Sequence, residues 1–267
     1  PALVPHLAGR PFTMKRYPDG WQGEHFFQKD APKHMPEWIR TEAYRSTSRA
    51  SREKRTIRYP IVADELALLW MVNMGCIDMN TWYSRVDRPD RPDWVLFDLD
   101  PSADSGFEQV VEVALLVRDA LDAAGLESYP KTSGADGIHV LVPITRRSTY
   151  DDTRSFAETV ARRLAAEHRG LVTTEWAKAK RRGVLIDANQ NGEGKTIASA
   201  YSVRPASGAP VSTPLRWDEV RPGVDPSAFT TEVVLERLGR HGDLFEPVLR
   251  GGQSLAQAAR RVSSPGA

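Results

Sequence analysis

The segment that most constrains the fold of this 267-residue chain is an apolar run that carries two acids, Trp94-Val-Leu-Phe-Asp-Leu-Asp-Pro101. The part from Trp94 to Leu99 is short, apolar and mostly strand-favouring, which predicts a buried β-strand. Pro101 is expected to end this strand, because proline has no N–H to donate to a neighbouring strand. Side chains two apart on a strand point to the same side, so Asp98 and Asp100 should project together.

The patterns around this strand mix further strands with amphipathic helices, and this order predicts a mixed α/β fold. Further strands are expected at residues 10–17, 21–29, 126–131, 138–143 and 184–187. Helices are expected at residues 64–74, from an N-cap at Ser105 to Gly125, at 149–168, and near 231–238 and 255–262. The polar stretch 44–58 is either a flexible loop or an exposed strand pair, and the charged stretch 87–92 is expected to be a connector.

Charge is divided unevenly along the chain, although the net charge is only +1. Residues 1–60 hold twelve Lys/Arg and six Asp/Glu, whereas residues 61–130 hold four Lys/Arg and fourteen Asp/Glu. A basic part beside an acidic part suits a protein that binds a polyanion with one and cations with the other, but two solvated faces would give the same counts. No apolar run is long enough to span a membrane, and the single cysteine, Cys76, excludes an internal disulfide. A cytoplasmic protein is therefore expected.

Asp98 and Asp100 indicate a divalent metal site. Two adjacent carboxylates repel each other and are costly to bury; a cation removes that conflict, and hard oxygen ligands suit Mg²⁺ or Mn²⁺. The acids also stand at the carboxyl end of their strand, where open α/β sheets bind ligands. The alternative is that both acids only cap the next turn. Asp187 favours the metal site, because it also ends a short apolar strand, and three converging acids suit two-metal chemistry on phosphate esters.

A second candidate site lies in the segment Lys131-Thr-Ser-Gly-Ala-Asp-Gly-Ile-His139. Its glycines allow close approach of the backbone to a ligand, and its turn amides with the Ser133 hydroxyl can form an anion-binding nest. His139 begins a strand and could donate to a phosphate oxygen. The alternative is a glycine-rich hairpin with a surface histidine. The position close behind the Asp98 strand favours phosphate binding.

Basic residues and aromatics supply a candidate nucleic-acid surface. Lys15 and Arg16 precede a hairpin turn, and Phe26 and Phe27 follow it. Aromatics interleaved with Lys and Arg suit base stacking and phosphate neutralisation. Core packing is the alternative for Phe26 and Phe27, but neighbours on a strand face opposite ways, so at most one of them fills a given core. Further basic residues around the Asp187 strand are Lys178, Lys180, Arg181, Arg182, Lys195 and Arg204.

These motifs resemble the polymerase domain of bacterial ligase D and its stand-alone relatives in the archaeo-eukaryotic primase superfamily. The resemblance runs from Leu7-Ala-Gly-Arg-Pro11 to Pro214-Leu-Arg-Trp217. Its most specific parts are Phe97-Asp-Leu-Asp-Pro101, Ser133-Gly-x-x-Gly-x-His139, and Ile186-Asp187 followed by Gln190-Asn191 and Gly194-Lys-Thr196. It implies one primase-polymerase domain, with a catalytic sheet flanked by helices and a second, smaller β-containing lobe. We divide this domain into a basic lobe (1–90), a catalytic core (91–205) and C-terminal helices (206–267).

The resemblance also implies an activity: template-dependent nucleotidyl transfer in DNA end joining or gap filling, often favouring ribonucleotides and Mn²⁺, with two Mn²⁺ or Mg²⁺ ions per site. The implied partners are primer–template or gapped DNA, nucleoside triphosphates, Ku and an ATP-dependent DNA ligase, and no membrane. The implied metal-binding residues are Asp98, Asp100 and Asp187. The implied nucleotide-binding residues are Lys15, Asn80, Ser133, His139, Gln190 and Arg204. The implied DNA-binding residues are Arg16, Phe26, Phe27, Lys29, Lys180 and Arg181.

Two positions depart from the pattern of the relatives. Asn80 stands where relatives commonly have His; it can hydrogen-bond a sugar or phosphate but carries no charge. Asp136 stands where relatives often have Lys, so one triphosphate contact is expected to be missing. The lysines that hold a downstream 5′-phosphate in relatives lie upstream of the stretch printed here, so the resemblance does not extend to 5′-phosphate recognition.

Two other functions remain open from the residues alone. Phe-Asp-Leu-Asp at a strand end also suits a phosphohydrolase of the haloacid dehalogenase type, with Asp98 as nucleophile and Asp100 as the acid, although Pro101 follows at once. A non-catalytic nucleic-acid-binding module would keep the basic lobe but would need no acid triad.

Overall fold

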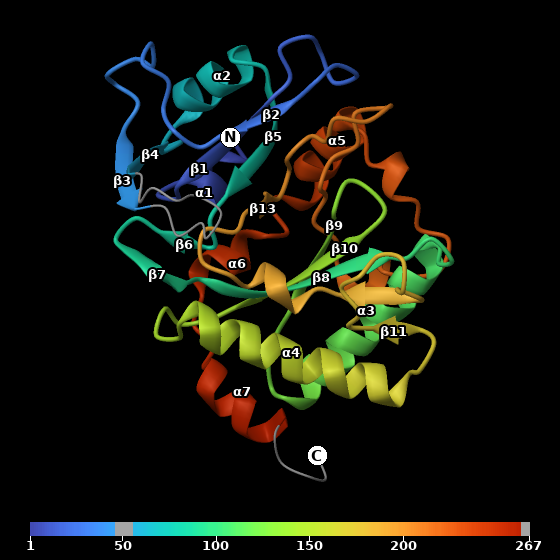
Figure 1. The fold of residues 1–267 in the computed structure, drawn as a ribbon. Coiled ribbons are helices and arrows are strands. Elements are labelled where there is room, and N and C mark those ends of the chain that lie inside the picture. The colour runs from blue at the N-terminus through green and yellow to red at the C-terminus, as the bar shows by residue number, and fades with distance from the viewer. Residues whose placement is uncertain (46–55, 263–267) are drawn as a thin grey trace.

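The computed structural model describes residues 1–45 and 56–262 and contains two main sheets (Figure 1). A five-stranded sheet lies near the centre of the molecule, with two long helices, α3 (Phe107–Ala123) and α4 (Tyr150–Glu167), along one face. A four-stranded sheet, built mainly from the N-terminal part of the chain, lies on the other side. The mixed α/β class predicted from the sequence is confirmed.

The central sheet has the strand order β11-β12-β8-β10-β9. Its strands are β8 (Trp94–Pro101), β9 (Tyr129–Thr132), β10 (Ile138–Pro143), β11 (Val172–Thr173) and β12 (Val184–Ile186). All neighbouring strands are antiparallel except β11 and β12. The sheet is therefore not an open parallel sheet. Such a sheet was assumed when a ligand site was predicted at the carboxyl end of the strand. Asp98 and Asp100 do lie at the carboxyl end of β8, as predicted, but the comparison with open parallel sheets was wrong because both neighbours of β8 are antiparallel.

β8 has two different faces because its side chains alternate. Val95, Phe97 and Leu99 are fully buried in the apolar core formed with α3 and α4. Burial of such side chains is worth roughly 1.5–3 kcal/mol each. The opposite face carries Asp98 and Asp100. Apolar packing on one face of β8 therefore holds the two acids on a rigid element.

The helices largely match the predicted ones. Thr149 caps α4 by accepting a hydrogen bond from the Asp152 N–H. α3 begins after Gly106, not after Ser105 as predicted, because the Gln109 side chain accepts from the Gly106 N–H at 2.9 Å and closes the first turn. The predicted C-terminal helices are α5 (Thr231–His241) and α7 (Leu255–Val262), whereas the short α6 (Glu246–Arg250) was not predicted.

The N-terminal sheet has the order β13-β5-β1-β2. β1 (Phe12–Arg16) and β2 (Phe26–Gln28) form the predicted antiparallel hairpin. β5 (Cys76–Thr81) and β13 (Ile197–Ala198) complete the sheet and were not predicted. The predicted helix α2 (Glu65–Asn73) contributes to the apolar core beside this sheet. Because β13 follows the Asp187 strand in sequence, one segment of chain runs from the central sheet into the N-terminal sheet.

Shorter elements complete the described part of the chain. β3 (Thr41–Arg45) pairs with β4 (Thr56–Pro60), as one alternative for 44–58 expected; the middle of that stretch lies outside the described residues. β6 (Ser84–Arg85) pairs with β7 (Arg88–Pro92), so 87–92 contains an edge strand and the connector prediction was wrong. The remaining elements are α1 (Val4–Leu7), η1 (Ala188–Gln190), η2 (Trp217–Glu219) and η3 (Pro226–Ala228). No helix among the described residues is both long and apolar enough to cross a membrane.

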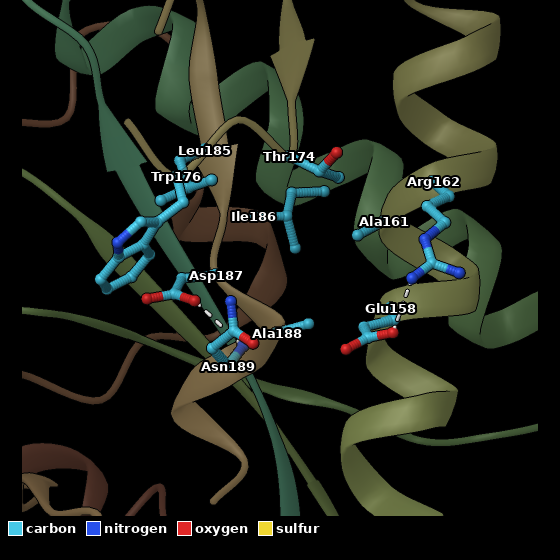
Figure 2. Close-up of a pocket in the computed structure, with 10 residues that line it drawn as sticks. All are labelled: Glu158, Ala161, Arg162, Thr174, Trp176, Leu185, Ile186, Asp187, Ala188 and Asn189. Carbon is cyan, nitrogen blue, oxygen red and sulfur yellow. Dashed lines mark hydrogen bonds and ion pairs between the residues drawn. The ribbon is translucent and has the colours of Figure 1, made fainter. Parts of the chain in front are cut away.

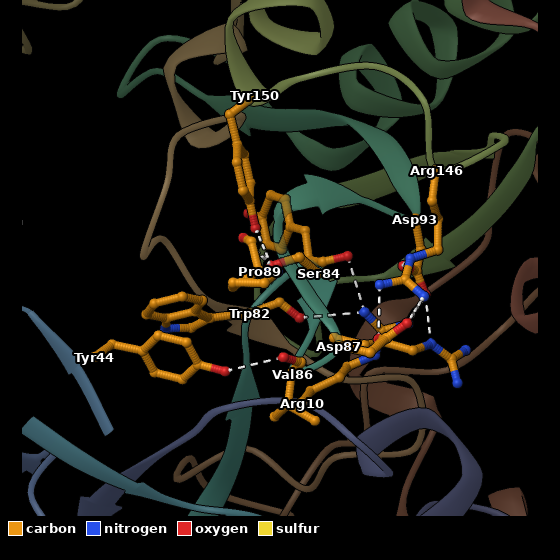
Figure 3. A network of polar contacts seen from close by, with 12 residues as sticks. Arg10, Tyr44, Trp82, Ser84, Val86, Asp87, Pro89, Asp93, Arg146 and Tyr150 are labelled. Carbon is orange, nitrogen blue, oxygen red and sulfur yellow. Dashed lines mark hydrogen bonds and ion pairs between the residues drawn. The ribbon is translucent and has the colours of Figure 1, made fainter. Parts of the chain in front are cut away.

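A buried arginine network fixes the chain just before β8 (Figure 3). Arg10 is fully buried and donates to Asp93 Oδ2 at 2.6 Å and to the Tyr83 carbonyl oxygen at 2.9 Å. Arg85 and Arg146 also contact the Asp93 carboxylate, at 2.7 and 3.1 Å. Burial lowers the pKa of Arg10 to about 10, against the opposing effect of Asp93. Since a buried charge without a partner is strongly destabilising, this network ties the segment before β1 to the start of β8.

Candidate active site

Four polar side chains form one row across the central sheet. In the antiparallel register, Lys131 of β9 is opposite His139 of β10, and His139 is opposite Asp98 of β8. Asp187 directly follows β12 and donates its backbone N–H to the Asp98 carbonyl oxygen at 2.9 Å. Directly opposite residues of an antiparallel pair share one face of the sheet. The register therefore brings together two of the predicted acids and the predicted histidine.

The three acids lie close enough to oppose one another's ionisation. Burial raises the pKa of Asp98 to about 6, against the positive charges of Lys131 and Arg204. Burial also raises the pKa of Asp100 to about 6, and the neighbouring Asp98 carboxylate adds to this effect. The pKa of Asp187 is raised by the same two causes, burial and then Asp98. A bound cation would offset this crowding of negative charge.

The donor chemistry of these acids fits a hard divalent cation, because carboxylate oxygens are what Mg²⁺ and Mn²⁺ prefer. Asp98 is held by protein partners: its Oδ1 lies 3.2 Å from His139 Nε2, and the Gln190 side chain also hydrogen-bonds it. Within residues 1–45 and 56–262, no group of three or more His, Cys, Asp or Glu side chains is arranged so that it could hold a metal ion. The crowding of the acids is thus the observation that favours a cation.

The turn between β9 and β10 is organised by Ser133. Its Oγ accepts hydrogen bonds from the N–H groups of Ala135 and Gly137, both at 3.1 Å. The Ala135 and Gly137 amides are therefore already paired and are not free to bind the anion in the predicted nest. A hydroxyl that already accepts two hydrogen bonds can make a further one only by donating its hydrogen. A Cβ at Gly137 would lie 2.5 Å from the Leu99 carbonyl oxygen, so the close approach to β8 requires glycine.

A pocket opens beside this turn. Its walls include Asp100 and Ser133 together with two basic residues, Lys178 and Arg181. Asp136 also lines it, and its carboxylate adds to the larger effects of burial and Asp98 that raise the pKa of Asp100. The pocket therefore combines two acids with two cations and the Ser133 hydroxyl. The cations and the hydroxyl are groups that suit a phosphate.

Two further cations approach the site and share one buried carboxylate. Asp78 of β5 has its Oδ2 3.0 Å from Lys15 Nζ and its Oδ1 3.1 Å from Arg204 Nε. Arg204 Nη1 also donates to the Ser133 carbonyl oxygen at 3.1 Å. Asp78 therefore holds both predicted nucleotide-binding cations, one from β1 and one from beyond β13, next to the Ser133 turn.

Asn80 and Gln190, the two remaining residues predicted to bind the nucleotide, lie beside Asp78 and Asp98 respectively. Asn80 is on β5, and its side chain donates to the Asp78 carbonyl oxygen at 3.1 Å. Gln190 ends η1 beside Asp98. Its neighbour Asn191 is buried and bonds both backbone groups of Leu96, at 2.9 and 2.8 Å, so this residue fixes the loop after Asp187 against β8.

Phe26 and Phe27 are both exposed, at 46% and 58%, so core packing is wrong for either ring. They lie opposite Arg16 and Lys15 in the β1–β2 pair. The Arg16 guanidinium carbon is 5.3 Å from the Phe26 ring centre, and Lys15 Nζ is 5.8 Å from the Phe27 ring centre. Lys29 is exposed just beyond β2. The hairpin thus presents two aromatic faces with cations beside them.

The segment between β11 and β12 places basic and aromatic groups near the acids. Lys180 is exposed, whereas Arg181 is buried and donates to the carbonyl oxygens of Glu175 and Trp176. Arg181 therefore belongs to the pocket wall and not to an open surface. Trp176 is 61% exposed and lines a second pocket together with Asp187 (Figure 2).

Three residues of this site were not singled out from the sequence. Lys131 and Asp78 are charged residues inside predicted or actual strands, and a charge in an otherwise buried strand is a usable signal. Trp176 stands in a polar loop, where nothing in the sequence distinguishes it from other surface aromatics.

Carboxylates gathered with buried cations and a hydroxyl-bearing turn on one sheet face define an enzyme that transfers phosphoryl or nucleotidyl groups. The chain belongs to the LigD primase-polymerase family, because the model described as "LigD, primase-polymerase domain" matches residues 1–245. It is accordingly a primase-polymerase domain of the nucleotidyltransferase class, and this family implies a divalent metal.

Individual relatives agree with this assignment. The multifunctional non-homologous end joining protein LigD of Mycolicibacterium smegmatis is 32% identical over 251 residues, covering 92% of this chain and 32% of that protein. The bifunctional non-homologous end joining protein LigD of Bacillus subtilis is 32% identical over 253 residues, covering 94% and 40%. The chain thus spans only 32% and 40% of the length of these two relatives. The polymerase domain of Mycobacterium tuberculosis ligase D, solved in complex with DNA, matches with a TM-score of 0.85 and 30% identity, covering 94% of this chain and 88% of that one.

Proposed function

We propose that this chain adds nucleotides, ribonucleotides among them, to a DNA primer 3′-hydroxyl under the direction of a template, in end joining or gap filling. The observation that carries this proposal is the row of side chains across the central sheet. It sets acids at one end and cations with a hydroxyl-bearing turn at the other. In this order the acids would bind metal at one end of the row, and the cations and the turn would bind phosphate at the other.

In this proposal Asp98, Asp100 and Asp187 hold Mn²⁺ or Mg²⁺, two ions per site, and the raised pKa values of the three acids are the supporting observation. Bound metal would activate the primer hydroxyl and neutralise charge on the triphosphate. The acids must be ionised to bind metal. Because burial and mutual repulsion make that ionisation costly, a bound cation would lower its free-energy cost.

The triphosphate is proposed to lie over the β10–β9 side of the row. Ser133 has a free hydroxyl hydrogen there, and His139 presents Nε2. Lys15 and Arg204 exchange part of their contact with Asp78 for phosphate oxygens. Gln190 and Asn80 complete the nucleotide contacts, with Asn80 offering an uncharged amide.

Reaction geometry then assigns the primer to the other side. The attacking and leaving oxygens of a phosphoryl transfer are roughly in line through phosphorus. If pyrophosphate leaves over His139 and Ser133, the primer hydroxyl must approach over Asp187. Trp176 lies there, exposed and beside the Asp187 carboxylate (Figure 2), and the exposed Lys180 is in the same loop. We therefore assign Trp176 to stacking on the primer terminus.

The template is assigned to the β1–β2 hairpin. Exposed aromatic rings stack on bases of any sequence, and neighbouring cations neutralise the backbone. Phe26 and Phe27 supply the rings, with Arg16 and Lys29 for phosphates. Arg181, also predicted to bind DNA, lines the pocket beside Asp100 and donates to the Glu175 carbonyl oxygen.

The repair context is proposed by likeness to the LigD proteins, whose names describe non-homologous end joining. Ku and an ATP-dependent DNA ligase are the partners expected in that context. The division into a basic lobe (1–90), a catalytic core (91–205) and C-terminal helices (206–267) is part of the same proposal; β13, from the middle stretch, completes the N-terminal sheet and would couple the first two parts.

The proposal is tested by extension of a gapped DNA with ribo- or deoxyribonucleotides, each with Mn²⁺ or Mg²⁺. Addition of the templated nucleotide, strongest with ribonucleotides and Mn²⁺, is expected. Release of phosphate from a generic phosphomonoester without extension would instead favour the phosphohydrolase alternative. DNA and nucleotide binding that metal titration leaves unchanged, again without extension, would favour the non-catalytic module.

A further inference from the structure

Lys131 is a buried lysine whose Nζ forms no ion pair with a carboxylate of residues 1–45 or 56–262. Its side chain is 1% exposed, and Nζ lies within hydrogen-bond distance of three polar atoms. These are the Ala198 carbonyl oxygen at 2.9 Å, Ser212 Oγ at 2.6 Å and His139 Nδ1 at 2.6 Å. Burying a lysine away from any carboxylate costs free energy, which suggests that these contacts serve a function.

The hydrogen positions follow from the partners. The Ser212 hydroxyl donates to the Thr132 carbonyl oxygen at 2.8 Å, so it has no hydrogen left for Lys131 and must accept from it. The Ala198 carbonyl oxygen can only accept. Burial, and then the charge of Arg204, lower the pKa of Lys131 well below its ordinary value, against the opposing effect of Asp98. In its ammonium form Lys131 has three hydrogens, and the third is directed at His139 Nδ1.

The other ring nitrogen of His139 requires the same arrangement. Nε2 lies 3.2 Å from Asp98 Oδ1, a carboxylate oxygen that accepts hydrogen bonds. A neutral imidazole carries a single hydrogen, so if Nε2 donates, Nδ1 must accept. A hydrogen on Nδ1 would instead point at the Lys131 ammonium, whose Nζ is 2.6 Å away. Both neighbours of the ring thus select one tautomer.

We propose that Lys131 is a positioning residue that holds His139 as the Nε2–H tautomer, so that Nε2 is an obligatory hydrogen-bond donor, either to Asp98 or to a phosphate that takes the place of this contact. Lys131 itself does not reach the substrate, because it lies behind the ring. The part of this inference that concerns phosphate rests on the proposed function; the tautomer does not.

The sheet register also explains how Lys131, from β9, comes to contact the His139 ring. Lys131 is opposite His139 in the β9–β10 register, so its long side chain runs along the same sheet face as the ring. Its contact with Ala198 joins it to β13 of the N-terminal sheet. The orientation of His139 is therefore set by both sheets at once.

The direct test reads the tautomer in the folded protein. Long-range ¹H–¹⁵N correlation spectra of ¹⁵N-histidine-labelled chain distinguish a protonated Nε2 from a protonated Nδ1. The chain has six histidines, and the His139 signals are identified by their loss in His139→Gln. The expected result is a neutral Nε2–H ring in the wild type and a mixed or reversed tautomer in Lys131→Met.

A wild-type ring protonated at Nδ1 alone would overturn the proposal without any variant. A Lys131→Met protein with an unchanged Nε2–H ring would overturn it equally. If Lys131→Met does not fold, Lys131→Gln, which keeps one amide donor, replaces it and is expected to leave a mixed tautomer. The exposed Lys195→Met variant is the control and should leave the His139 signals in place.

Kinetics supply a second readout. Lys131→Met is expected to raise KM for the nucleoside triphosphate about tenfold, the effect of losing one well-aimed hydrogen bond to a charged group. In a His139→Gln background the same substitution should change KM by less than about twofold, because residues that act through one group are not additive. Additive effects would contradict the proposal. A wild type that extends no primer but shows the Lys131-dependent tautomer would remove the proposed function and leave this inference standing.

Discussion

Asp187 and Asp98 sit across from each other on neighbouring antiparallel strands, joined by the 2.9 Å hydrogen bond from the Asp187 N–H to the Asp98 carbonyl oxygen. This bond continues the β12–β8 ladder by one residue beyond Ile186. It makes the third acid part of the sheet and not of a free loop. The spacing of the two carboxylates is therefore set by strand pairing, before any cation is present.

The raised pKa values of the acids predict opposite effects of pH on stability and on metal binding. Between about pH 4 and 6 the folded protein holds protons on Asp98 and Asp100 that the unfolded chain has lost, so metal-free stability falls as pH rises through this range. Metal needs the ionised carboxylates, so Mn²⁺ affinity should rise over the same range. Melting curves with and without Mn²⁺ at pH 5 and pH 7.5 check this. A Mn²⁺-induced rise in Tm that is equal at both pH values would contradict it.

Removing the rings of the hairpin should weaken DNA binding without unfolding the protein. Phe26 and Phe27 are exposed, so Phe26→Ala and Phe27→Ala should change stability by less than about 0.5 kcal/mol. Stacking of a base on an aromatic ring is worth about 1–3 kcal/mol, so the Kd for primer–template should rise about tenfold for each variant. Fluorescence anisotropy measures the Kd. Trp38→Ala removes another exposed aromatic, 56% accessible, and serves as the matched control with no effect expected.

Trp176→Ala should affect the primer and spare the nucleotide. If the indole stacks on the primer terminus, KM for the primer rises about tenfold while KM for the nucleoside triphosphate stays within about twofold. Steady-state extension with each substrate varied in turn separates the two constants. An equal rise in both, or a rise in the nucleotide constant alone, would place Trp176 on the wrong side of the acids.

Reversing the charge at Asp136 should improve nucleotide binding. Asp136 lines the pocket beside Asp100 and Ser133, at the position where the resemblance to the polymerase family implies a Lys. Asp136→Lys is expected to lower KM for the nucleoside triphosphate by about three- to tenfold, because a repulsive charge near the phosphates becomes attractive. Asp136→Asn should give an intermediate value. The assignment of this pocket to phosphate fails if Asp136→Lys leaves KM unchanged or raises it.

Much of the fold was predictable because its main elements have strong local patterns. β8, β10, α3 and α4 each combine a continuous or periodic apolar face with a clear end signal. Strand direction was not predictable in this way. β8 pairs with β10 and β12, which lie about 40 and 85 residues further along, and such pairing depends on tertiary packing that no local pattern records. β13 has only two residues and gives no local signal.

The site was predictable in its acids and less so in its cations. Asp98, Asp100 and Asp187 stood out because an acid that ends an apolar run is unusual. Ser133 was predicted as a nucleotide contact, but its hydrogen bonds from the Ala135 and Gly137 amides were not predicted. Lys131 and Asp78 matter through contacts with residues distant in sequence, and their importance appears only when the sheet register is known.

The central claim is that the acids of the sheet support nucleotidyl transfer, and Asp98→Asn tests it most directly. The measurement is single-nucleotide extension of a gapped primer–template with Mn²⁺, comparing the wild type with Asp98→Asn at matched, folded concentration. The account predicts templated addition by the wild type and a rate lower by about 10²–10³-fold or more in the variant. It also predicts a metal-free Tm at pH 7.5 no lower than that of the wild type, because a buried like charge has been removed. A variant that extends the primer within about twofold of the wild-type rate would contradict the account.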